Sequence, residues 1–267
     1  MTSAATVSMT RARYLSAAAE RIRETAYNLG YRIGGATDGY PLPPARLVRL
    51  VIGSGQLAWY QLGGMYSHQA IVRLLRTHGV PVEAFTRILD FGVGCGRLLR
   101  YWGGLRHTCE IWGTDCNRDL IEWCRRKLSF AKFTVNDADP PLEFPSAMFD
   151  FVYSYSVFTH LSAERQQPWL RELSRVLRPG GYMLITVHGV NLAMRNSLPP
   201  AAIDQMNRGE LVVVSSELSG TNVCAAFHSE PYIRQHLAQG LEVIEYFPRG
   251  MPDGTEQDIY LFRKPAE

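Results

Sequence analysis

The segment Arg87–Arg100 restricts the fold of this chain more than any other stretch of its sequence. Residues 88–91 are apolar enough to predict a short buried strand, and Arg97 begins the first turns of a predicted helix. The turn between them holds Gly92, Gly94 and Gly96. Glycine lets a ligand approach the main chain closely, and helix N-terminal amides point to the same place. A strand, a glycine-rich turn and a helix therefore predict a cradle for a nucleotide-like ligand.

Asp90 lies just before this turn, where its carboxylate is expected to face a cationic or hydroxyl-bearing ligand. The spacing is G-x-G-x-G and differs from the G-x-G-x-x-G of a dinucleotide fingerprint. A turn with three glycines also serves as a plain tight connection, so the turn alone leaves both interpretations open. No Lys-Ser/Thr pair follows it, and a P-loop type of phosphate cradle is not predicted.

Predicted strands and helices alternate from Arg87 onward. The strands are Ile88–Phe91, Cys109–Thr114, Ala131–Val135, Phe149–Ser154 and Tyr182–Val187, and the helices are Leu98–Leu105, Arg118–Leu128 and Glu164–Leu177. This alternation predicts an α/β fold, a doubly wound parallel sheet with helices on both faces. Because crossovers between parallel strands are right-handed, polar residues at the strand ends are expected to meet along one edge.

Carboxylates follow two of these strands. Asp115 comes 19 residues after Gly96, where a carboxylate accepts hydrogen bonds from both hydroxyls of a ribose. Asp137 follows the third strand, where it would accept a hydrogen bond from an adenine amino group, with Ala138 against the ring. Taken singly, Asp115 also suits a helix N-cap and Asp137 a turn. Their placement at successive strand ends favours a nucleotide site.

The rest of the chain surrounds this predicted sheet. Before it we expect helices at Thr10–Leu29 and Ala45–Ile52 and one or two helices over Gln56–His78, with a bend or a close approach by another group at Gly63-Gly64. After it we expect partial helix in Asn191–Arg208 broken at Pro199-Pro200, a hairpin of Leu211–Ser216 with Val223–His228, a helix at Glu230–Gln239 and strands at Leu241–Phe247 and Ile259–Arg263. We divide the chain into an N-terminal helical region and lid, residues 1–86, and a Rossmann-like domain, residues 87–267, with an insertion at about 190–228.

Composition argues against several other classes of protein. The net charge of +3 in 267 residues is too close to balance for a nucleic-acid scaffold. The five cysteines form no C-x-x-C pair, so neither a disulfide framework nor a metal site is predicted, and reduced thiols in a cytoplasmic protein are the simpler interpretation. Residues 1–9 lack the apolar core of a signal peptide, and no window is apolar enough to span a membrane. We expect no nucleic-acid partner, and the oligomeric state stays open.

The ordered motifs resemble those of the class I S-adenosylmethionine-dependent methyltransferases. The resemblance rests on Ile88–Arg97, Asp115, Asp137-Ala138, Phe149–Ser154 and Leu177–Gly181, and within the class Phe158–Leu161, Ala226–Ser229 and Gln257-Asp258 are similar to a bacterial small-molecule subgroup. Some members of that subgroup act on sugars, lipids or secondary metabolites. The resemblance implies a seven-stranded Rossmann-like sheet whose last strand is antiparallel. It also implies S-adenosylmethionine as cofactor and methyl transfer, by O- or N-methylation, to a small-molecule acceptor.

The resemblance also implies roles for single residues. The glycines would lie against the amino-acid end of the cofactor, Asp115 would hold the ribose, and Ser154 with Tyr155 would lie near the sulfonium. The full set expected to bind the cofactor is Asp90, Gly92, Gly94, Gly96, Asp115, Cys116, Asp137, Ala138, Ser154, Tyr155 and Tyr66. Trp59, Tyr60 and Tyr66 precede the sheet and are expected either to line a lid over the acceptor or to pack in the core.

An oxygen acceptor has to lose a proton, so histidine bases are candidates for catalysis. His188, at the end of the fifth strand, is the best placed, and His160 follows the fourth strand. His228 and His68 are weaker candidates, and each histidine also suits a packing role. Two other functions stay open, a nicotinamide-dependent oxidoreductase and a non-methylating protein that binds S-adenosylmethionine.

Overall fold

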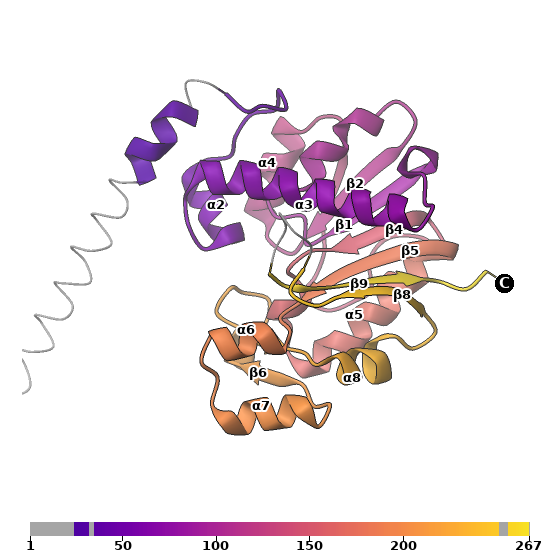
Figure 1. Cartoon of the computed structure of the whole chain (residues 1–267). Helices are drawn as coiled ribbons and strands as arrows, with labels where there is room; N and C mark the ends of the chain where they lie inside the picture. Colours follow the sequence, from indigo (N-terminus) through magenta and orange to yellow (C-terminus); the bar gives the residue numbers. More distant parts are fainter. Residues whose placement is uncertain (1–23, 32–34, 251–255, 267) are drawn as a thin grey trace, which may run out of the picture.

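The fold is built around one mixed sheet of seven strands (Figure 1). The computed structural model describes residues 24–31, 35–250 and 256–266. The strands of the large sheet are β1 (Arg87–Phe91), β2 (Glu110–Asp115), β3 (Lys132–Val135), β4 (Phe149–Ser154), β5 (Leu177–Val187), β8 (Glu242–Phe247) and β9 (Asp258–Arg263). Their order across the sheet is β3-β2-β1-β4-β5-β9-β8.

The first five strands are parallel, as the alternation of strands and helices predicts. The last strand, β9, runs antiparallel to both β5 and β8. The predicted doubly wound sheet of seven strands with an antiparallel last strand is confirmed. The strand order reverses between β1 and β4, and α/β sheets bind ligands beyond the carboxyl ends of the strands at such a point.

Helices cover both faces of the sheet, and each face has its own apolar core (Figure 1). On one face lie α2 (Ala45–Ile52), α3 (Leu57–Thr77) and α4 (Arg118–Lys127), and on the other lie α5 (Ala163–Val176) and α8 (Glu230–Tyr232). Successive residues of a strand point to opposite faces. Ile88 of β1 accordingly packs in the first core, and Leu89 and Phe91 pack in the second. Burial on both faces of the sheet therefore explains why β1 has apolar residues on both sides.

Helix α3 runs without interruption through Gly63-Gly64, and the close approach by another group that the pair predicts is confirmed. A Cβ atom on Gly64 would lie 2.4 Å from the carbonyl oxygen of Arg97, and one on Gly63 would lie 2.6 Å from Nη2 of the same arginine. Two glycines cost a helix about 1 kcal/mol each relative to alanine. They let α3 lie directly on the residue that follows the glycine-rich turn.

Three predicted elements differ in form or extent. The helix after β1 is a 3-10 helix, Leu99–Leu105, and its sequence includes Gly103-Gly104, which weakens an α-helix. The helix expected at Glu230–Gln239 is one α-turn followed by a π-turn, Ile233–Leu237. Strand β5 begins at Leu177 because Gly180 and Gly181 exchange backbone hydrogen bonds of 2.9 Å with Lys264. Most of the helix expected at Thr10–Leu29 lies outside the described residues. Residues 24–31, which the structure describes, are helical.

The segment after β5 forms a small unit beside the sheet (Figure 1). It contains α6 (Val190–Arg195), α7 (Pro200–Asn207) and the antiparallel pair β6 (Val212–Val214) and β7 (Ala225–Phe227), which confirms the hairpin and the break at Pro199-Pro200. Its own core contains Ala193, Met206, Val212 and Phe227. None of the helices in the described parts of the chain has the length and apolarity needed to cross a bilayer.

Candidate cofactor and acceptor site

The glycine-rich turn closes tightly at the carboxyl end of β1. Gly92, Gly94 and Gly96 all have positive φ, at 80°, 57° and 77°, where a side chain is strained. Side chains from three other elements also occupy the space that a Cβ would need. The nearest atoms would be Val157 Cγ2 at 2.1 Å from Gly92, Val51 Cγ2 at 2.8 Å from Gly94 and Leu128 Cδ1 at 2.4 Å from Gly96. Glycine is therefore required at all three positions for both backbone and packing reasons.

Asp115 joins this turn to the end of β2. Its Oδ2 accepts a hydrogen bond of 2.8 Å from the backbone N–H of Gly94, and its Oδ1 accepts one of 2.8 Å from the N–H of Asn117. Burial raises the pKa of Asp115, and these two backbone hydrogen bonds act in the opposite direction. The helix N-cap of α4 is Asn117, whose side chain accepts from two backbone amides. Asn117, and not Asp115, therefore caps this helix. Cys116, which lies between them, is exposed.

Asp90 is buried beneath the turn. The hydroxyl of Tyr153 donates a hydrogen bond of 2.7 Å to its Oδ2. Burial raises the pKa of Asp90 to about 8, the Tyr153 hydrogen bond lowers it in part, and the nearby Asp115 raises it further. In the free protein Asp90 therefore carries a proton at neutral pH, and a cation placed beside it would favour the charged form.

We expect this buried carboxyl to make the free protein less stable as pH rises. The folded-state pKa of about 8 lies above the unfolded value of roughly 4, so the folded chain holds an extra proton between these pH values and loses stability as pH increases. The neutral variant Asp90→Asn removes this term. Its free energy of unfolding relative to wild type should rise by about 2 kcal/mol between pH 6 and pH 8, as measured by urea denaturation. Parallel pH profiles for the two proteins would contradict the assignment, and Asp119→Asn, at an exposed site, serves as control.

The third strand end is more open. Asp137 and Ala138 are both exposed, and the Ala138 carbonyl accepts a hydrogen bond of 3.1 Å from Trp169 Nε1. Their neighbour Asn136, which the sequence analysis did not select, accepts a hydrogen bond of 2.8 Å from the Thr114 hydroxyl through Oδ1. Asn136 therefore ties the end of β3 to β2, and it holds the backbone from which Asp137 projects.

The end of β4 carries a network that sequence reasoning missed. Ser154 is fully buried and its Oγ has no hydrogen-bond partner among the described residues, whereas the Tyr155 hydroxyl lies 2.7 Å from Ser67 Oγ of α3. The next residue, Ser156, has φ of 64°, a strained value for a residue with a side chain. Its N–H donates to the Thr186 hydroxyl at 2.7 Å, and Gln257 Nε2 donates to its Oγ at 2.8 Å. Backbone strain of this kind concentrates at functional sites.

His160 and His188, the two predicted catalytic residues, come together although 28 residues separate them. Their ring centroids are 6.1 Å apart and the rings are perpendicular. His160 Nδ1 lies 2.7 Å from the Cys224 carbonyl, and Nδ1 of His188 has no hydrogen-bond partner among the described residues. Burial lowers the pKa of both rings, that of His188 to about 4, so both are neutral at pH 7. The unprotonated nitrogen of each ring can therefore accept a hydrogen bond at pH 7.

Of the weaker histidine candidates, His228 lies next to this pair, since its backbone N–H donates a hydrogen bond of 2.7 Å to the His188 carbonyl. His228 is fully buried, and its Nε2 is 3.1 Å from Gln166 Oε1, which is a packing role. Tyr60 is also fully buried and donates a hydrogen bond of 2.7 Å to the Cys95 carbonyl, so it belongs to the core and not to a lid. Trp59 and Tyr66 remain partly exposed on α3.

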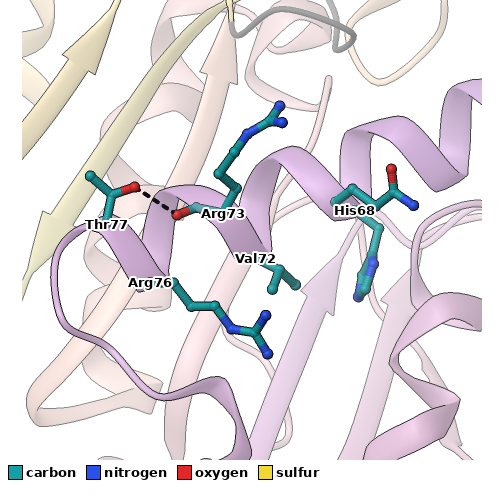
Figure 2. Close-up of a pocket in the computed structure, with 6 residues that line it drawn as sticks. His68, Val72, Arg73, Arg76 and Thr77 are labelled. Carbon is teal, nitrogen blue, oxygen red and sulfur yellow. Dashed lines mark hydrogen bonds between the residues drawn. The ribbon is translucent and has the colours of Figure 1, made fainter.

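A pocket of about 500 Å³ lies along the second half of α3 (Figure 2). It is lined by His68, Gln69, Val72, Arg73, Arg76 and Thr77, and Figure 2 shows these side chains along one helix. Among the predicted residues only the weak candidate His68 borders it. The glycine turn and the acids at the strand ends contribute nothing to its lining, so this pocket is separate from the candidate site at the carboxyl edge of the sheet. In the described ranges no cluster of three or more His, Cys, Asp or Glu side chains suits a metal ion.

Residues 89–185 match the family described as "Methyltransferase domain". Three similar curated proteins are a malonyl-[acyl-carrier protein] O-methyltransferase of Enterobacter lignolyticus, a fatty-acid O-methyltransferase of Mycolicibacterium smegmatis and a tRNA (carboxymethyluridine(34)-5-O)-methyltransferase of Arabidopsis thaliana. In this order, their matched segments are 31%, 38% and 39% identical to this chain. These segments cover 40%, 38% and 38% of its length. The match spans 41%, 36% and 23% of the relatives' own lengths, less than half of each.

The fold has solved counterparts. An S-adenosylmethionine-dependent methyltransferase from Methanosarcina mazei superposes with a TM-score of 0.54 at 20% identity, covering 72% of this chain and 98% of the other. The sheet order, the glycine turn and the matched domain together define a Rossmann-like methyltransferase domain. Residues 89–185 therefore carry a methyltransferase domain, and the fold agrees with the resemblance of the ordered motifs to the class I S-adenosylmethionine-dependent methyltransferases, whose cofactor is S-adenosylmethionine.

The residues at the carboxyl edge fit this cofactor. The three glycines let the turn close tightly beside the end of β2, where Asp115 lies. Asp115 has carboxylate lone pairs beyond the two that its backbone contacts use, and the exposed Asp137 offers a second acceptor. Ribose hydroxyls and an adenine amino group are donors of the matching kind.

Proposed function

We propose that this chain transfers a methyl group from S-adenosylmethionine to an oxygen or nitrogen atom of a small-molecule acceptor. The observation that supports this most directly is the contact between Asp115 and the Gly94 N–H, which unites the glycine turn and the second strand end in one site. The cofactor supplies a methyl group on a good leaving group. The protein then has to bind, orient and exclude water.

The roles that we propose follow from position. Gly92, Gly94 and Gly96 accommodate the amino-acid end of the cofactor, Asp115 with Cys116 borders the ribose, and Asp137 with Ala138 borders the adenine. Asp90 favours the cationic end because binding a positive charge beside it ionises its carboxyl. Ser154, Tyr155 and Tyr66 complete the proposed cofactor set, with Tyr155 held in place by Ser67.

We place the acceptor between α2 and the unit formed by residues 190–228. These parts meet beside the carboxyl edge, since Asn222 Nδ2 donates a hydrogen bond of 2.8 Å to the Leu50 carbonyl and the Gly220 N–H donates one of 2.7 Å to the His160 carbonyl. Leu50 and Val223 leave half or more of their surface exposed there, at 50% and 59%. Half-exposed apolar side chains suit an acceptor with an apolar part, such as a lipid or a secondary metabolite.

The names of the three relatives describe a malonyl group, a fatty acid and a carboxymethyl group, each of which contains a carboxyl. A carboxylic acid is already ionised at neutral pH and needs no base. The lowered pKa of His188 suits such an acceptor, because a ring with a pKa of about 4 is a weak base. We propose that His188 and His160 contact the acceptor and position its oxygen. Near-neutral charge disfavours nucleic acid as the acceptor, and the five free thiols suit the cytoplasm.

The proposal is tested with methyl-labelled S-adenosylmethionine and a panel of carboxylic acids, alcohols and amines. We expect labelled product with at least one class and binding of S-adenosylhomocysteine but not of NAD by calorimetry. Tight NAD binding alone would favour an oxidoreductase. Cofactor binding with no labelled product from any acceptor, or from a metabolite extract, would favour a protein that binds the cofactor without methylating.

A further inference from the structure

Arg97, the first residue after the glycine turn, is a half-buried cation without a counter-charge among the described residues. Its Nε is fully buried and has no hydrogen-bond partner among the described residues, and no carboxylate of the described residues forms an ion pair with it. Burying a cation without a partner is costly, so a protein keeps one where something else satisfies it. Neither the predicted cofactor set nor the comparisons assign Arg97 a role.

Arg100, one turn further along the chain, shows what a structural arginine looks like here. Its guanidinium pairs with both carboxylate oxygens of Asp38 and donates hydrogen bonds of 2.7 and 3.3 Å to the carbonyls of Tyr40 and Pro41. Arg100 thus anchors the loop before α2 to the domain. Arg97 lies only three residues away, yet the residues that the structure describes give it no such set of partners.

The surroundings of Arg97 are built to hold its guanidinium in one place. Gly63 and Gly64 of α3 leave the space that Arg97 fills, since Cβ atoms there would meet its Nη2 at 2.6 Å and its Cγ at 3.0 Å. The ionisable groups nearest to its guanidinium are the hydroxyls of Tyr155, Tyr60 and Tyr101 and the thiol of Cys95, and none of them is a carboxylate. Trp59 is 56% exposed, and its ring lies 3.8 Å from the position that a Cβ atom on Gly63 would take. A fixed cation beside an accessible aromatic ring suits an anionic group with an organic body.

We propose that Arg97 binds a carboxylate of the bound ligand, supplied either by the methionine moiety of the cofactor or by the acceptor. A guanidinium offers two parallel N–H donors that match the two oxygens of a carboxylate. Arg97 directly follows the turn that we assign to the amino-acid end of the cofactor, and its charge lies beside Tyr155, which we assign to the sulfonium end. Both sources therefore reach it. This inference rests on the proposed function.

The test compares wild type with Arg97→Met, which keeps the apolar stem and removes the charge. Calorimetry measures the affinity of each protein for three ligands. The first is S-adenosylhomocysteine, and the second is 5′-methylthioadenosine, which lacks the amino-acid tail. The third is decanoate, added to the complex with S-adenosylhomocysteine. If the cofactor supplies the carboxylate, R97M weakens S-adenosylhomocysteine binding about 10- to 100-fold and leaves methylthioadenosine unchanged. If the acceptor supplies it, S-adenosylhomocysteine binding is unchanged and decanoate binding falls by the same factor.

Equal affinities of the two proteins for S-adenosylhomocysteine and for decanoate overturn the proposal. Failure of wild type to bind either adenosyl ligand would instead overturn the proposed function. Arg118→Met, an exposed arginine at the start of α4, controls for the change in net charge. Arg97→Lys keeps the charge without the planar fork and should give an intermediate affinity. Because Arg97 is an unpaired cation, R97M should fold and melt at least as high as wild type; a lower melting temperature with unchanged affinity would mark a purely structural residue.

Discussion

Replacing Asp115 with alanine should weaken the binding of S-adenosylhomocysteine about 100-fold, because the carboxylate would no longer accept two charge-assisted hydrogen bonds from the ribose hydroxyls. The same substitution also removes the two hydrogen bonds of 2.8 Å that the N–H groups of Gly94 and Asn117 donate to this carboxylate. The turn would lose its link to β2, so part of the loss in affinity comes from a looser cradle. Calorimetry measures the affinity.

Asp119→Ala provides the matched control for this change. Asp119 lies four residues further along, at the start of α4, and its side chain is 67% exposed in a contact with Arg46. The two variants change the net charge by the same amount. An equal loss of affinity in both would assign the effect to general electrostatics, and an unfolded D115A protein in circular dichroism would assign it to folding.

Replacing Gly92 with alanine should destabilise the protein by about 3 kcal/mol. The residue has φ of 80°, which costs about 1–2 kcal/mol for a residue with a Cβ, and the added atom would lie 2.1 Å from Val157 Cγ2. Chemical denaturation of the purified variant measures the change.

Gly180→Ala separates the two contributions. Gly180 has nearly the same φ, 73°, and nothing within 4 Å of an added Cβ. It should therefore cost only the backbone term of about 1–2 kcal/mol. Combining Gly92→Ala with Val157→Ala should recover part of the difference. If G92A and G180A were equally stable, the contact with Val157 would not contribute to the conformation of the turn.

The order and type of the main strands followed from local sequence. Phe149–Ser154 was predicted to the residue, and β1, β2, β3 and β9 were predicted to within one residue at each end. Such strands are apolar runs bounded by polar residues and glycine, and those signals are local. Local and tertiary preferences differ at one glycine pair. Gly63-Gly64 weakens a helix locally, yet α3 passes through it because contact with Arg97 requires small residues there.

The candidate site was predictable in part for the same reason. Asp90, the three glycines and Asp115 are recognisable because each stands at a strand end or in the turn. Tyr60 illustrates the limit, since a helical aromatic may face a ligand or the core, and only its burial and its contact with the Cys95 carbonyl place it in the core. The strained Ser156 carried no sequence signal at all.

The sequence by itself determined the class of sheet, the glycine turn and the acids at its edge, because strand periodicity and glycine conformation depend on neighbouring residues. Only the tertiary structure decided which distant groups meet. It brought His160 beside His188, joined Gln257 to Ser156, and packed Arg97 on a helix more than thirty residues earlier, with no counter-charge in the described part of the chain. Those contacts arise from chain folding across long loops, where burial of apolar surface on both faces of the sheet fixes the geometry and local sequence does not.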